Sequence, residues 1–213
     1  PTVAVNIVDL TLTDTDPSSL VTFEFSETVL GFDAGDLTPV GGALSGFTAI
    51  DGDSYTATFT ATDGLATTGS VTVAAGSYTN LALNLGAAGF DTVAIDTVRP
   101  TVAIVVADTA LNIGETSLVT FTFSEAVTGF TNADLTIENG TLTPVASGDG
   151  GITWTATLTP AAAITDATNV ITLATGSVFD LASNANSGAT DSNNYAIDTV
   201  RPTVAIVVAD TAL

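Results

Sequence analysis

The side chains that could do chemistry in this sequence are almost all carboxylates. The chain has 23 acidic residues and only two basic ones, Arg99 and Arg201, and it contains no histidine, cysteine or lysine. Catalysis would have to rely on hydroxyl groups or carboxylates, and a carboxylate pair in a substrate cleft, as in glycoside hydrolases, is the common arrangement left open. The acids instead recur at matching places along the chain, for example Asp36 and Asp134. This recurrence favours a structural role, and we expect no enzyme.

Oxygen ligands for a hard cation are the second chemistry that these residues could support. Aspartate greatly outnumbers glutamate here, and aspartate is common in turns and in calcium sites, where the ion takes roughly six to eight oxygens. The same bias has a simpler interpretation. Surface acids keep a protein soluble, and aspartates in turns accept local hydrogen bonds from the backbone. Both interpretations stay open at this point.

Composition also limits the partners and the location of the chain. A formal net charge of −21 argues against a nucleic-acid partner, because phosphate binding needs clustered basic residues. Without cysteine there is no disulfide framework and no thiolate metal site. No apolar run is long enough to cross a bilayer, so we expect no membrane insertion in this segment. The chain begins at Pro1 without a signal peptide, and we expect it to be an internal fragment of a longer protein.

The elements that position the acids belong to an internal repeat. The segment Asp96–Leu111 recurs unchanged at Asp198–Leu213. Further pairs connect the first two copies: SLVTFEFSETVLGF with SLVTFTFSEAVTGF, YTATFT with WTATLT, and GSYTNLALN with GSVFDLASN. The repeats predict two domains, residues 1–99 and 100–201, followed by the first strand of a third repeat at residues 202–213.

Within each repeat the hydrophobic residues alternate with polar ones. Val119, Phe121 and Phe123 follow this period of two, which is typical of strands with one buried face. Clusters of Gly, Asn, Asp and Ser separate these runs, so each repeat offers about seven short strands in roughly 100 residues. The predicted fold class is all-β, with tandem immunoglobulin-like β-sandwich domains joined end to end.

The quoted segments resemble the bacterial immunoglobulin-like repeats of giant secreted adhesins, including RTX-type biofilm adhesins. A PTV start, an LVTFTFSEAVTGF block, a YTAT strand, a DLASN loop and an IDT end occur in that order over nearly the whole of both repeats. The resemblance implies an extracellular location on a bacterial cell surface and a role in adhesion or biofilm formation. Periodicity and composition by themselves predict an extended extracellular spacer, with neighbouring repeats of the same chain as its partners.

Immunoglobulin-like topology predicts that several acids meet at the junctions between repeats, because successive strands alternate in direction. The resulting arrangement is similar to cadherin junctions, where calcium stiffens the rod, and we expect calcium here. The loop Asn80–Asn84 of repeat 1 lacks the leading aspartate, which weakens any site built on that copy. The candidate ligands are Asp14, Asp16, Asp63, Asp96, Glu125, Asp134, Asp180 and Asn184 at the first junction, and Asp108, Glu115, Asp166 and Asp198 at the next.

Two other functions compete with a spacer. The third-copy strand, Pro202–Leu213, is apolar and could complete a sheet in another copy of the protein, so the chain could be a subunit of a self-assembling filament or surface layer. A carbohydrate-binding module would need an exposed aromatic platform. Phe23, Phe25, Tyr55 and Trp154 instead fall on the phase of their strands that we expect to be buried.

Overall fold

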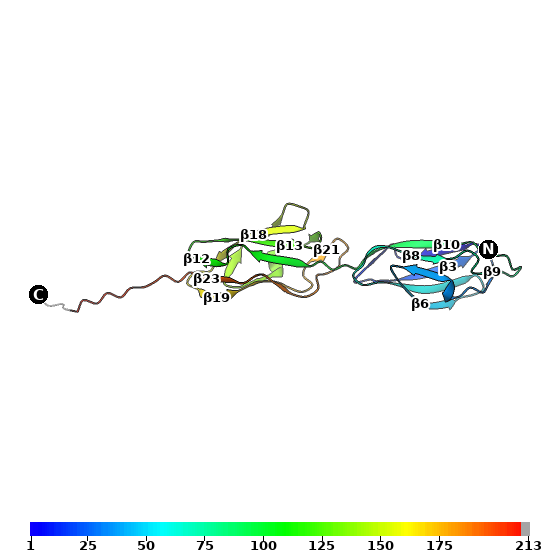
Figure 1. Cartoon of the computed structure of the whole chain (residues 1–213), viewed down its shortest axis with the longest axis horizontal. Coiled ribbons are helices and arrows are strands. Elements are labelled where there is room, and N and C mark those ends of the chain that lie inside the picture. The colour runs from blue at the N-terminus through cyan, green and yellow to red at the C-terminus, as the bar shows by residue number, and fades with distance from the viewer. Residues whose placement is uncertain (210–213) are drawn as a thin grey trace. The chain divides into compact units, whose positions relative to one another are not determined.

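The computed structural model describes residues 1–209, which fold into two compact units (Figure 1). Unit 1 comprises Pro1–Arg99 together with the short segment Asp180–Asn184, and unit 2 comprises Pro100–Phe179 and the chain from Ala185 onward. The segment Asp180–Asn184 is therefore part of repeat 2 in the sequence and part of unit 1 in the structure. Over residues 1–209, no helix has the length and apolar character needed to span a membrane.

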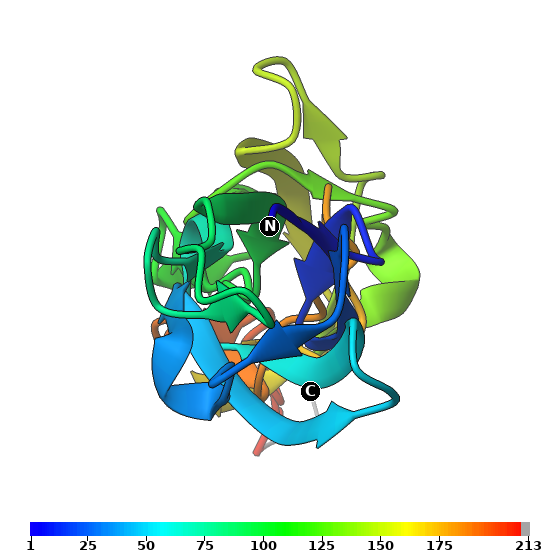
Figure 2. The same cartoon turned by 90° about the vertical axis from the view of Figure 1, so that its right-hand side faces the viewer.

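Unit 1 contains two four-stranded sheets. The strands are β1 (Val3–Ile7), β2 (Thr11–Thr13), β3 (Ser18–Phe25), β4 (Val29–Leu30), β5 (Leu37–Val40), β6 (Gly42–Ala49), β7 (Ser54–Ala61), β8 (Ala66–Val73), β9 (Thr79–Asn80) and β10 (Gly89–Asp96). One sheet has the order β1-β3-β7-β6, the other has the order β2-β10-β8-β5, and the short strands β4 and β9 pair with each other. All neighbours are antiparallel except β2 and β10, which are parallel. Side chains from both sheets form a single core, and Figure 2 shows the blue and cyan strands of unit 1 around this interior. Unit 1 is a β-sandwich.

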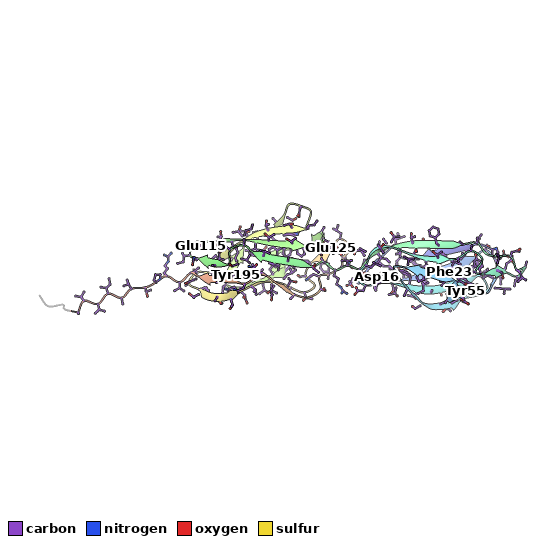
Figure 3. All side chains as sticks on the ribbon, in the orientation of Figure 1. Asp16, Phe23, Tyr55, Glu115, Glu125 and Tyr195 are labelled. Atoms are coloured by element: carbon purple, nitrogen blue, oxygen red, sulfur yellow. The ribbon has the colours of Figure 1, made fainter. Side chains whose placement is uncertain are left out.

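The core of unit 1 follows directly from the alternation in its sequence. In β3, Val21, Phe23 and Phe25 are buried, whereas Leu20 and Glu24, which alternate with them, are exposed. The ring of Phe32 makes edge-to-face contacts, with centroids 5.6 Å from Phe23 and 4.8 Å from Phe25. Such contacts add about 0.5–1.5 kcal/mol each beyond the area they bury. Phe23 and Tyr55 lie inside the unit (Figure 3), which confirms their predicted place in the core.

Unit 2 repeats this framework with shorter strands. They are β11 (Val102–Val106), β12 (Ala110–Asn112), β13 (Ser117–Phe123), β14 (Val127–Thr128), β15 (Leu135–Ile137), β16 (Gly140–Leu142), β17 (Ala146–Ser147), β18 (Thr153–Pro160), β19 (Thr165–Asn169), β20 (Ile171–Leu173), β22 (Thr190–Asp191) and β23 (Tyr195–Asp198), while β21 (Phe179–Asp180) crosses the division between the units. The sheets have the orders β11-β13-β18-β16, β12-β23-β19 and β15-β20-β22. Its core includes Phe121, Phe123 and Tyr195, with Trp154 packed partly buried against it. The predicted all-β, immunoglobulin-like fold class is confirmed.

A single-turn 3₁₀ helix recurs in each unit at η1 (Ala34–Asp36) and η2 (Asn132–Asp134). In both, the last residue of the turn is an aspartate whose carboxylate accepts a hydrogen bond from the backbone N–H that precedes the turn, at 2.9 Å for Asp36 and 2.7 Å for Asp134. Each turn is thus closed by a capping box. The recurrence of this acid in the sequence has a local structural cause.

The predicted third-copy strand lies at the end of the chain. Residues 202–209 are exposed and belong to no strand, and residues 210–213 lie outside the described residues. The same PTVAIVV sequence forms β11 in unit 2, where it pairs with β13. The sequence contains no third copy of β13 with which residues 202–208 could pair in the same way. Their assignment to a third repeat stays a prediction.

Candidate metal centre

The loop Asp180–Asn184 holds a buried carboxylate. Asp180 is 3% exposed, and its Oδ1 and Oδ2 accept hydrogen bonds from the backbone N–H and the side-chain Nδ2 of Asn184, both at 2.8 Å. The backbone of the loop closes on itself, because the N–H of Asp180 donates to the carbonyl of Asn184 at 3.1 Å. Ser183 takes a positive φ of 70° in this turn. These bonds offset part of the cost of removing the Asp180 charge from water.

Asn184 fixes this loop to the rest of unit 1. The residue is fully buried, and its Oδ1 accepts a hydrogen bond of 2.7 Å from the backbone N–H of Asp14. Its Nδ2 donates to the backbone carbonyl of Asp96 at 2.9 Å, in addition to its bond to Asp180. Both protons of the amide and its oxygen are therefore satisfied. The loop is held against the ends of β2 and β10.

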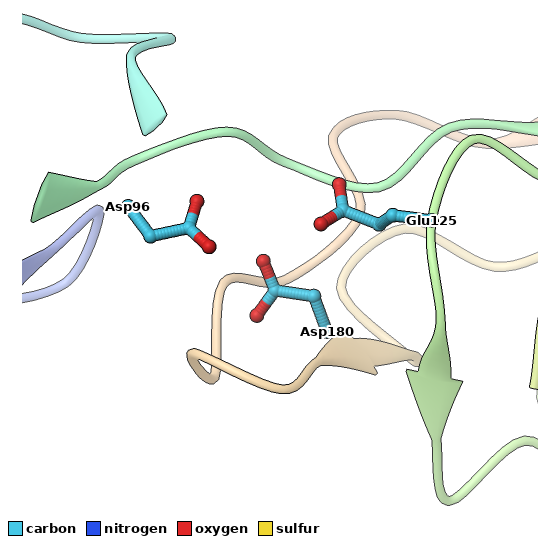
Figure 4. Close-up of side chains that lie close together, drawn as sticks. All are labelled: Asp96, Glu125 and Asp180. Carbon is cyan, nitrogen blue, oxygen red and sulfur yellow. The ribbon is translucent and has the colours of Figure 1, made fainter. Parts of the chain in front are cut away.

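Two predicted ligands, Asp96 and Asp180, come together in unit 1. One carboxylate oxygen of each lies within 4.8 Å of the other (Figure 4). Two oxygens bound to one calcium ion at roughly 2.3–2.6 Å can be separated by up to about 5 Å. The pair therefore fits the coordination sphere of a calcium ion, and each Asp180 oxygen keeps acceptor capacity beyond its bond to Asn184. Glu125, the third side chain drawn in Figure 4, belongs to unit 2, follows β13 and is partly buried.

Asp14 already has a cationic partner. Its two carboxylate oxygens accept hydrogen bonds from Nε of Arg99, at 2.9 Å, and from Nη2 of Arg99. This bidentate pair raises the pKa of the Arg99 guanidinium above its usual value, with a smaller contribution from the charge of Asp63. Because the Arg99 side chain is 40% exposed, solvent screens the pair, which contributes little to stability. Its geometric effect is to tie the loop after β2 to the chain that follows β10.

Both repeats match one family of protein domains. Residues 1–95 and 96–197 each match the model described as the bacterial Ig-like domain. The chain belongs to this family. The comparison with curated proteins gave no match.

Solved structures similar to these Ig-like domains include bacterial and animal proteins. The chain is 15% identical to the adhesin InvE of Yersinia pseudotuberculosis, with a TM-score of 0.34, over 92% of this chain and 58% of that one. It is 14% identical to invasin, described as a bacterial integrin-binding protein, with a TM-score of 0.38, over 81% and 36%. A tandem from titin gives 8% identity and a TM-score of 0.31, over 94% and 66%. The chain thus spans just over half the length of the InvE structure and about a third of that of invasin.

Other predicted ligands of the Ig-like repeats lie at turns, in loops or at the end of a strand. Asp134 closes the capping box of η2, and Asp198, at the end of β23, accepts hydrogen bonds from Thr165 Oγ1 at 3.0 Å and from the N–H of Val200 at 3.3 Å. Asp16 lies in the loop between β2 and β3, and Asp63 in the loop between β7 and β8. The hydrogen bonds of Asp134 and Asp198 are those of local turn chemistry.

A buried threonine at the end of each Ig-like domain was not among the predicted functional residues. Thr97 is buried, its Oγ1 accepts a hydrogen bond from the N–H of Leu65 at 3.0 Å, and it donates to the carbonyl of Thr62 at 2.9 Å. Thr199 makes the matching bonds with Ile164 and Ala161 in unit 2. The threonine follows the aspartate in both copies of DTVRP, and this recurrence could have identified it.

Proposed function

We propose that this chain is an extender segment of a bacterial cell-surface adhesin, with a structural and not a catalytic role. The observation that carries the proposal is the direct tandem of two bacterial Ig-like domains, in which the second family match begins at the residue after the first one ends. The connection between β10 and β11 runs only from residue 97 to residue 101, and Thr97 within it is buried and hydrogen-bonded. So short a connection leaves little linker flexibility between successive domains.

The charge of the chain supports an extracellular spacer. With a net charge of −21 and only two basic residues, neighbouring chains repel one another, which opposes collapse and association on a crowded surface. The intact protein would be secreted and would hold a binding module away from the bacterial cell. By its resemblance to RTX-type repeats, the role would lie in adhesion and biofilm formation.

Calcium is the finer part of the proposal. The Asp96 and Asp180 oxygens are close enough to share one ion, and Asp180 is a buried carboxylate, whose charge a cation would compensate. Glu125 and other loop acids predicted from the topology would supply further oxygens. Bound calcium would then limit the angle between successive domains and would raise their stability by mass action.

Small-angle X-ray scattering and thermal melting, with millimolar calcium and then with excess chelator, test this role. We expect a longer, stiffer particle and a higher melting temperature in calcium, and Asp96→Asn should weaken both responses. Asp33→Asn is the matched control, because it removes the same charge at a position where asparagine caps the η1 turn equally well. Shape and melting temperature that do not respond to calcium would remove calcium from the proposal, and a compact or freely jointed particle in both conditions would contradict the extender.

Strand addition is a second candidate function, favoured by the exposed chain end. Val204 and Ile206 are 83% and 84% exposed, although the same sequence pairs in β11. In a filament or surface layer, this segment would complete a sheet in another copy of the protein. Sedimentation velocity over a range of concentrations, on the chain and on a version that ends at Arg201, tests it. Association that disappears with the shorter version would favour the filament over the extender.

A further inference from the structure

The amide of Asn184 extends a strand ladder in unit 1. The parallel pair β2–β10 begins with a hydrogen bond from the N–H of Ala94 to the carbonyl of Leu10, at 3.1 Å, and ends at the partners Thr13 and Asp96. The next rung would join the N–H of Asp14 to the carbonyl of Asp96. Instead, the Asn184 side chain lies between these groups, accepting from the first and donating to the second. A primary amide carries one acceptor and donors on one planar group, so it replaces a peptide unit here.

Unit 2 contains the same ladder. Its partners are Ala110 and Ala196, Leu111 and Ile197, and Asn112 and Asp198, in the parallel register of β2 and β10. It begins with a matching hydrogen bond from the N–H of Ala196 to the carbonyl of Thr109, at 2.8 Å. The next rung would join the N–H of Ile113 to the carbonyl of Asp198. Within residues 1–209, no hydrogen bond joins these two groups to each other, and no side chain bridges them.

A groove accompanies the ladder in each unit. In unit 1 it is lined by residues of β2 and β10 and by Leu181 and Ala182 of the docked loop. In unit 2 the matching residues of β12 and β23 line a groove together with Thr165–Ala167 at the start of β19. Unit 2 thus has the ladder and the groove, and the described part of the chain supplies no loop that docks there as Asp180–Asn184 does in unit 1.

We propose that this end of unit 2, the N–H of Ile113, the carbonyl of Asp198 and the β12–β23 groove, is a docking seat for an Asp-Leu-Ala-Ser-Asn loop of the repeat that begins at Pro202. The segment that leads away from each seat is the same, since Asp96–Leu111 and Asp198–Leu213 are identical. A repeat that continues as repeat 2 does brings the same loop to the same distance along the chain. The seat is independent of calcium and of adhesion, and it goes beyond the proposed function.

The chemistry of the seat selects asparagine with aspartate four residues before it. An aspartate in place of the asparagine could accept from the N–H but could not donate to the carbonyl. The leading aspartate orients the amide, as Asp180 does for Asn184. In the loop of repeat 1, Asn80 cannot do this, because its Oδ1 accepts from the N–H groups of Ala82 and Asn84, at 3.0 and 2.9 Å, and its Nδ2 donates to Glu27 at 3.2 Å. We therefore expect the seat to prefer the loop of repeat 2 over that of repeat 1.

Amide hydrogen exchange tests the seat. In the chain of 213 residues, the Asp14 N–H should exchange slowly and the Ile113 N–H quickly. A three-repeat chain, made by continuing after Leu213 with a further copy of residues 112–201, should slow exchange at Ile113 by at least about tenfold. Asn184→Ala or Asn184→Asp in the added copy alone should restore fast exchange at Ile113.

Two results would overturn the proposal. One is fast exchange of the Ile113 N–H in a three-repeat chain whose added copy is folded, as judged by amide exchange as slow as that of repeat 2. The other, measured on the original chain, is an Asp14 N–H that stays protected after Asn184→Ala, because the bridging amide would then not be what holds the rung. Repeating the exchange in excess chelator separates the seat from calcium, since protection at Ile113 should persist there even if the extender loses its stiffness.

Discussion

Alkaline unfolding of unit 2 should be governed by one buried phenol. Tyr195 is fully buried, and its hydroxyl donates to the backbone carbonyl of Glu138 at 2.6 Å. Burial raises the pKa of this phenol to about 12, with a smaller contribution from the charge of Glu138. In the unfolded chain a tyrosine ionises with a pKa of about 10. The folded state thus keeps a proton that the unfolded state releases.

The sign and size of the effect follow from linkage. The contribution of Tyr195 is fully present below about pH 10 and is lost as the pH rises through about 12, because the unfolded state gains stability by ionising first. A difference of about two pKa units corresponds to about 2.7 kcal/mol in the free energy of unfolding. The chain has no lysine and no cysteine, and its other two tyrosines, Tyr55 and Tyr78, belong to unit 1, so Tyr195 is the one phenol of unit 2 that titrates in this range.

Urea unfolding followed by the fluorescence of Trp154 is the assay, because this single tryptophan lies in unit 2. We expect the free energy of unfolding to fall by roughly 2 kcal/mol between about pH 9 and about pH 11.5. Tyr195→Phe should lower the free energy of unfolding by about 1 kcal/mol at neutral pH, because the hydrogen bond is missing. The variant should also lose most of the decrease in stability at alkaline pH. A wild-type stability that is flat over this range, or a phenylalanine variant that keeps the full dependence, would refute the reasoning.

Two further substitutions test individual contacts in unit 1. Asn184→Ala removes a buried amide that makes three side-chain hydrogen bonds, and it should lower the free energy of unfolding of unit 1 by about 2–4 kcal/mol. Asn84→Ala, at the matching exposed position, should change it by less than about 0.5 kcal/mol. Thermal unfolding followed by circular dichroism distinguishes the two variants, and equal effects would contradict the bridging role of Asn184. Gly86→Ala would place a Cβ 2.2 Å from the ring of Tyr78 and should cost about 1–3 kcal/mol, while Gly148→Ala, which meets nothing within 4 Å, should be close to neutral. Similar melting temperatures for the two glycine variants would show that the ring moves aside.

The fold could be predicted from the sequence because its signals are local and repeated. Alternation in Val119, Phe121 and Phe123 defines a strand and its buried face without knowledge of any partner. The identical segments at Asp96 and Asp198 show the period directly. Sheet order and register, by contrast, depend on which strands meet, and the parallel pairing of β2 with β10 has no local signal.

The candidate site was only partly predictable, because the residue type alone does not distinguish a metal-binding carboxylate from one that accepts local hydrogen bonds. Asp134 and Asp180 both lie in turn-rich stretches of repeat 2, yet one closes a capping box and the other is a buried carboxylate held by Asn184. The distinction depends on which N–H groups face each oxygen, and spacing does not contain that information. Asp14 was likewise predicted as a ligand, and its two oxygens are bound to Arg99.

The differences between the two repeats separate what depends on side chains from what depends on the backbone. Asp14 of repeat 1 corresponds to Ile113 of repeat 2, so Arg201 has no aspartate at the position that holds Arg99, and no ion pair of Arg201 occurs within residues 1–209. The N–H at this position is unchanged by the substitution, and the register of the ladder beside it is kept. A docking seat made of one N–H and one carbonyl therefore tolerates the change from aspartate to isoleucine, while the ion pair does not. Where repeats differ in their charged residues, contacts made by the backbone are the ones that every copy can share.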